Sequence, residues 1–175
     1  AHGGTVIFDP PVHNVPRGAA DTVQFLVTLD PIFPGFDAVT MLTGSDTIRF
    51  VSFIYHQQWL NAFHNFKGPI IDNKGSIVGV YDHEMYLGAN RSPNQYFADR
   101  INVGFLTASI VGLPEGEYFL TVDAIRDAQL SGVGSFGAFD PLFGQARVVI
   151  EPPCPPDCSD AYSCVVSDAE SLAPG

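Results

Sequence analysis

The sequence predicts an all-β fold: an Ig-like or jelly-roll-like two-sheet sandwich of about eight strands, with one short helix and an irregular Pro- and Cys-containing C-terminal tail. Apolar residues recur at alternate positions, separated by Gly, Pro, Asn and Asp, as in half-buried strands joined by turns. Helical periodicity is nearly absent, which argues against a parallel α/β sheet. The 175 residues, 46% of them hydrophobic, suffice for the core of one domain.

The predicted strands share one alternating pattern. In the clearest of them, Val23, Phe25, Val27 and Leu29 lie on one face and polar residues occupy most of the other. The full set of predicted strands is 5–8, 22–29, 36–43, 47–56, 76–87, 103–111, 117–126 and 145–151.

One segment, 57–66, has helical spacing instead. Trp59, Leu60, Phe63 and Phe66 are separated by intervals of three, four and seven positions, which place them on one side of a helix. We expect this short helix to lie across one end of the sandwich.

Proline divides the chain into three parts. Residues 1–16 are predicted to form a strand and a Pro-rich leash, because Pro10 and Pro11 cannot continue a sheet ladder. Residues 17–151 form the sandwich. Repeated prolines end the sheet at residue 152, and residues 152–175 are expected to be an extended tail.

The net charge of the chain limits its partners, and its first residue indicates its location. Eight Lys and Arg against nineteen Asp and Glu give a net charge of −11, which argues against a nucleic acid or an anionic membrane as partner. No apolar run approaches the roughly 20 residues that span a bilayer. The chain begins at Ala1, as removal of a signal peptide would leave it, so we expect a secreted, extracellular protein.

All three cysteines, Cys154, Cys158 and Cys164, lie in the tail. Three thiols allow at most one intramolecular disulfide, and the spacing is not that of a zinc knuckle or a thioredoxin site. We therefore expect a disulfide that staples the tail, with one thiol left over.

Several segments resemble cohesin-like modules. Residues 35–42 and 45–52 are similar to the third strand, the turn and the fourth strand of these modules. Residues 103–111, 112–118 and 144–150 resemble their last strands and those of related extracellular Ig-like domains. The resemblance implies an exported bacterial β-sandwich used for attachment or assembly.

The sequence predicts no catalytic or metal site. Residues 132–137 satisfy G-x-G-x-x-G, but no helix pattern follows, so this segment is predicted to be a flexible loop. Asp82, His83 and Glu84 alternate along a predicted strand and are expected on a solvated face. No nucleophile elbow and no distinct pair of carboxylates are present, so we expect neither an enzyme nor a cofactor.

A minor alternative is a copper-binding oxidative enzyme. His2 resembles half of the copper-binding histidine brace of oxidative polysaccharide enzymes. That family needs histidine as its first residue, whereas Ala1 precedes His2 in this chain.

Two features point to glycans. Asn90 opens an N-glycosylation-type sequon, Asn-Arg-Ser. Five aromatic residues could build a sugar-stacking platform: Tyr55, Trp59, Tyr81, Tyr86 and Tyr96. A monomeric cohesin-like or carbohydrate-binding adhesion module is thus the alternative function.

The leading hypothesis concerns the first strand, Thr5, Val6, Ile7 and Phe8. If the prolines that follow uncouple it from the domain, it could complete the groove of a neighbouring copy by donor-strand complementation. Repetition of this contact would give a linear or helical homopolymer. This layout resembles that of donor-strand subunits of bacterial pili, which implies a pilus-like fibre at the bacterial cell surface. Pairing in cis is the other possibility, and the sequence leaves open which face of the strand points inward.

Overall fold

The computed structural model describes residues 4–30, 36–92, 100–122, 131–134 and 139–153. Within these ranges the chain is almost entirely β, with one helix, α1 (Gln57–Ala62). The strands are β1 (Gly4–Asp9), β2 (Val12–Pro16), β3 (Thr22–Asp30), β4 (Phe36–Ser45), β5 (Arg49–Tyr55), β6 (Phe63–Asp72), β7 (His83–Arg91), β8 (Ile101–Ser109), β9 (Gly116–Val122), β10 (Ser131–Gly134) and β11 (Phe139–Glu151).

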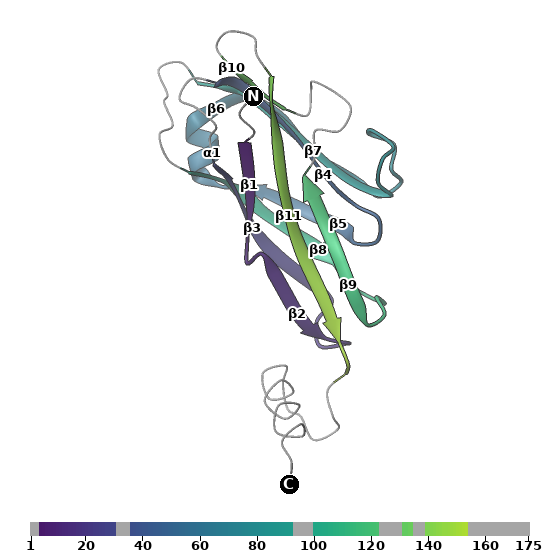
Figure 1. The fold of residues 1–175 in the computed structure, drawn as a ribbon. Helices are drawn as coiled ribbons and strands as arrows, with labels where there is room; N and C mark the ends of the chain where they lie inside the picture. Colours follow the sequence, from purple (N-terminus) through teal and green to yellow (C-terminus); the bar gives the residue numbers. More distant parts are fainter. Residues whose placement is uncertain (1–3, 31–35, 93–99, 123–130, 135–138, 154–175) are drawn as a thin grey trace.

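The strands form two layers that meet along β11 (Figure 1). Neighbouring strands follow the order β5-β8-β3-β1-β11-β10-β4-β7-β6, while β2 pairs with β11, and β9 pairs with both β11 and β4. We call the outer surface of β5, β8, β3 and β1 face A, marked by Ile54, Phe105, Leu26 and Ile7. The outer surface of β6, β7, β4 and β9 is face B.

The core lies between the two sheets. Phe25 and Leu106 from the first sheet and Met85 and Leu120 from the second belong to one buried cluster. At one end α1 covers this cluster with Trp59, which is fully buried; its ring stacks on that of Phe63 with centroids 3.9 Å apart. The all-β sandwich with one short helix is thus confirmed.

The first strand pairs within its own domain. β1 runs antiparallel to β3 over five residues and parallel to the start of β11, and β2 runs parallel to the end of β11. Val6 and Phe8 point into the core, each 2% exposed, whereas Thr5 is exposed and Ile7 half-buried on face A. The groove that a neighbour's strand would fill is therefore occupied in cis, and the structure gives no support to donor-strand exchange.

Several predicted boundaries are wrong. The helix ends at Ala62 rather than residue 66, because the backbone of Phe63 is already extended, with φ −126° and ψ 163°. β2, β6 and β10 are additional strands, so eleven are described where about eight were predicted. β10 contains residues 132–134 of the predicted glycine loop and pairs with β4 and β11; residues 135–137 lie outside the described ranges.

The predicted strand 76–87 shows the largest shift, since β7 starts only at His83. Residues 77–80 instead turn back and direct their backbone amides at one carboxylate, that of Glu84. Amides held in this way cannot pair with a neighbouring strand.

Candidate functional site

Glu84 is the most unusual polar residue among those described. It is fully buried, and its carboxylate accepts four backbone N–H groups, from Ile77 at 2.8 Å, Val78 at 2.9 Å, Gly79 at 3.0 Å and Val80 at 3.3 Å. Hydrogen bonds to a charged acceptor are stronger than those between neutral groups. The expected solvated face is therefore wrong for Glu84, which holds the connection between β6 and β7 in one shape.

Further side chains secure the start of this connection. Asp72 accepts from the Lys74 amide at 2.7 Å, the Ser76 amide at 3.0 Å and the Ser76 hydroxyl. The bonds from Ser76 and Lys74 hold the pKa of the Asp72 carboxyl below its usual value. The turn thus closes on itself before the chain reaches the Glu84 anchor.

Asn73 ties the same connection to the other sheet. Its Oδ1 accepts from the Phe50 amide and its Nδ2 donates to the Phe50 carbonyl, both at 3.0 Å. His83 Nδ1 lies 3.0 Å from the same Oδ1, and burial lowers the pKa of His83. We refer to residues 72–83 as the anchored loop.

The anchored loop covers one end of face B. A Cβ on Gly44 would overlap the ring of Tyr81, so that ring lies directly on β4. Leu42, on the outer side of β4, is 2% exposed, and strand register places Tyr86 opposite Leu42 and Ile70 opposite Tyr86. A row of apolar side chains therefore crosses face B beside the loop.

Two exposed apolar residues belong to face B, on the strands at its two sides. Ile70 of β6 is 51% exposed and Phe119 of β9 is 42% exposed. Phe119, Tyr81 and Thr121 also line a small depression of about 120 Å³ together with the side chain of Glu117. An apolar centre with charged residues at its margin is the composition of a protein-docking surface.

The strands at the two ends of the sheet order are poorly suited to pairing with another chain. β5 has a bulge between Phe50 and Ser52, and Asn73 occupies the Phe50 backbone groups that a further strand would need. β6 has two register shifts and contains Pro69, which has no N–H to donate. A partner is therefore more readily bound on a face than at an edge.

The predicted aromatic platform does not form from its described members. Trp59 is fully buried, and its ring stacks with that of Phe63. The ring of Tyr55, from β5, stacks on Trp59 as well. Tyr81 and Tyr86 lie on face B, and Tyr96 is outside the described residues. The sequon residue Asn90 is exposed on β7, and its glycosylation stays a prediction.

The described residues contain neither a candidate metal centre nor a candidate membrane-spanning helix. Among the described residues, no three His, Cys, Asp or Glu side chains come together as a metal site. His2, Cys154, Cys158 and Cys164 lie outside those residues. No helix in the described ranges has the length and apolar character needed to cross a bilayer.

Sequence reasoning missed the anchored loop, although signals for it exist. Glu84 directly precedes the alternating apolar residues of β7, and Asp82 lies two positions before it. Gly75 and Gly79, four residues apart, both have left-handed backbones, with φ of 70° and 77°. Two such glycines shortly before Asp82 and Glu84 indicate a loop that can fold back on a nearby carboxylate.

No family model matches the sequence, and no curated protein sequence matches it either. The chain is similar in structure to the type III cohesin of the cell-surface anchoring scaffoldin ScaE of Ruminococcus flavefaciens, with a TM-score of 0.58, 8% identity, and coverage of 85% of this chain and 87% of that one. For a non-cellulosomal cohesin of the archaeon Archaeoglobus fulgidus the TM-score is 0.54, with 12% identity and coverage of 84% and 91%.

A third similar structure is CaCohA2, a protein of Clostridium acetobutylicum, in its complex with CaDoc0917. Its TM-score is 0.55, with 14% identity and coverage of 85% of this chain and 99% of that one. Identities this low show the fold alone. The chain is therefore a cohesin-like β-sandwich domain.

Proposed function

We propose that this chain is an extracellular, non-catalytic module that docks a partner protein through face B. The observation that carries the proposal is the apolar surface of face B, formed by Ile70, Tyr86 and Phe119 together with Tyr81 of the loop that Glu84 holds in one shape. A preorganised surface loses little conformational entropy on binding. The complex and the anchoring scaffoldin among the similar structures support docking and attachment as the role of this fold.

A matched pair of variants tests which face docks. Ile70→Glu places a charge on face B and Ile54→Glu places one on face A; both isoleucines are more than half exposed, at 51% and 64%, so both variants are expected to fold. Wild type and variants are used to capture proteins from the extracellular fraction of the source organism. A partner retained by wild type and Ile54→Glu but lost by Ile70→Glu supports the proposal.

Retention by Ile70→Glu, or loss by Ile54→Glu alone, overturns docking on face B. Size-exclusion chromatography and electron microscopy of the same samples address self-assembly. A monomer is expected, because β1 is paired in cis. Filaments that disappear when residues 1–11 are deleted would revive the donor-strand hypothesis in place of the docking module.

A further inference from the structure

Face A carries a depression that plays no part in docking on face B. It has a volume of about 430 Å³. Its lining residues come from β1, β3, the start of β8 and the residue before β8, with one proline from the connection after β1: Ile7, Phe8, Asp9, Pro11, Leu26, Thr28, Arg100 and Asn102. The volume falls within the range of small-ligand sites.

Strand register orders these residues into rows. Thr28 pairs with both Ile7 and Asn102, and one step along the strands Leu26 pairs with both Asp9 and Phe105. Ile7 and Leu26 therefore form an apolar floor, with an amide at one side and a carboxylate at the other. The half-buried ring of Phe105 extends the floor beyond the depression.

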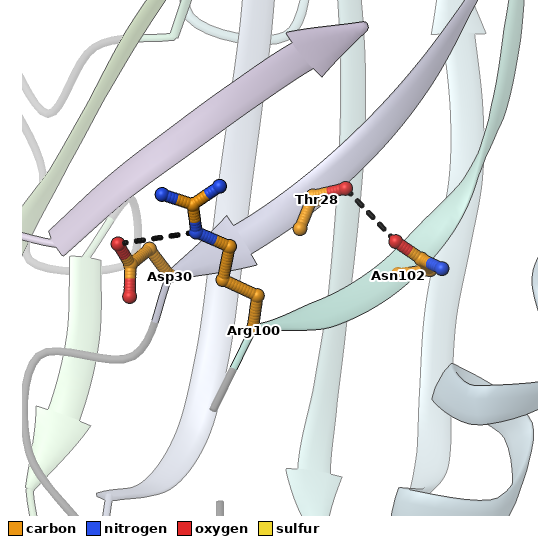
Figure 2. A network of polar contacts seen from close by, with 4 residues as sticks. All are labelled: Thr28, Asp30, Arg100 and Asn102. Atoms are coloured by element: carbon orange, nitrogen blue, oxygen red, sulfur yellow. Dashed lines mark hydrogen bonds and ion pairs between the residues drawn. The ribbon is translucent and has the colours of Figure 1, made fainter. Parts of the chain in front are cut away.

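The polar groups are oriented by contacts with their neighbours (Figure 2). The Thr28 hydroxyl donates to Oδ1 of Asn102 at 3.0 Å, which identifies the other amide atom as Nδ2, with two N–H groups to donate. Arg100 uses Nε for its 3.7 Å ion pair with Asp30, so the contact leaves its terminal nitrogens as further donors. Asp9 is exposed and offers only acceptor oxygens.

This arrangement selects a class of ligand. Donors on one side and acceptors on the other suit hydroxyl groups, which do both, and the apolar floor suits a ring face of C–H groups. The local charges of Asp9, Asp30 and Arg100, together with the net charge of −11, disfavour an anion. The N–H donors of Asn102 and Arg100 have no lone pair with which to coordinate a metal cation. We propose that the depression on face A binds a neutral saccharide.

Two conservative substitutions test the site together. Asn102→Asp keeps the oxygen that accepts from Thr28 but removes the amide donors, and Asp9→Asn removes the carboxylate; the double variant retains the net charge. The probe is an array of neutral oligosaccharides, and the saccharide that binds best is then titrated calorimetrically. Binding by wild type is expected, with a dissociation constant at least tenfold higher for the double variant.

Asp46→Asn is the matched control, since Asp46 is exposed but lies in the turn after β4. It should bind the saccharide like wild type, and so should Ile70→Glu. The proposal is overturned if no neutral oligosaccharide on the array binds, or if the double variant, folded by circular dichroism, binds as well as wild type. Neither result bears on docking on face B, because docking is tested separately with Ile70→Glu and Ile54→Glu.

Discussion

Faces A and B are shaped by different means. Face A is the plain outer surface of four neighbouring strands, and its residues are positioned by strand register. Face B is partly covered by the anchored loop, whose shape depends on one buried carboxylate and one amide side chain. Strand register thus sets most of face A, whereas a few side-chain contacts set the shape of the loop on face B.

The largest expected effect comes from Glu84→Gln. An amide nitrogen would face amide donors that now point at an oxygen, so we expect the free energy of unfolding to fall by about 2–3 kcal/mol. Docking on face B should weaken, while saccharide binding on face A should persist. Urea denaturation measures the first effect.

Glu117→Gln is the control for the stability measurement only, because Glu117 itself lines the depression on face B. Glu117 lies 2.6 Å from Arg147 in an ion pair whose side chains are 44% and 45% exposed. Its removal should cost less than about 1 kcal/mol. If Glu84→Gln and Glu117→Gln lower the free energy of unfolding equally, Glu84 does not organise face B.

A smaller effect is expected for Asn73→Ala, which frees both backbone groups of Phe50. The loss of two hydrogen bonds should cost about 1–2 kcal/mol. Hydrogen exchange is the sharper measurement, because the Phe50 amide should lose its protection while amides of β3 keep theirs. Asn61→Ala, which removes an exposed contact with Gln57, should change neither the free energy of unfolding nor the exchange of the Phe50 amide. If the Phe50 amide stays protected in Asn73→Ala, Asn73 does not hold the Phe50 backbone.

The smallest effect concerns Tyr55, which lies between the two sheets. Its buried hydroxyl has no hydrogen-bond partner among the described residues, so Tyr55→Phe should preserve stability or raise it slightly at neutral pH. Burial raises the pKa of Tyr55 to about 12 from 10.0. The unfolded chain therefore ionises first, and the free energy of unfolding should decrease as pH rises from about 10 to about 12.

Tyr55→Phe should lack this alkaline decrease, as measured by denaturation at several pH values. Tyr118→Phe serves for comparison, because the Tyr118 hydroxyl donates to the Pro114 carbonyl at 2.7 Å. That variant should lose stability at neutral pH. If Tyr55→Phe loses as much, its hydroxyl has a partner after all.

Face A could be predicted from sequence to a greater extent than face B. The alternation in residues 22–29 correctly places Phe25 and Val27 in the core, which assigns Leu26 and Thr28 to the outer surface. On face B alternation fails, because Ile77, Val78 and Val80 have the composition of a strand but bind a carboxylate instead. The alternation of apolar and polar residues does not reveal that the carboxylate of Glu84, only four to seven residues further along, accepts from these backbone amides.

β11 also has a mechanical consequence. Its 13 residues pair in parallel with β1 near its start and with β2 near its end, so the first and last described strands run in the same direction. Force that pulls the start of β1 away from the end of β11 would act along these strands. Their hydrogen bonds would then be sheared together rather than opened one after another, so a module anchored at one end and loaded at the other would resist extension.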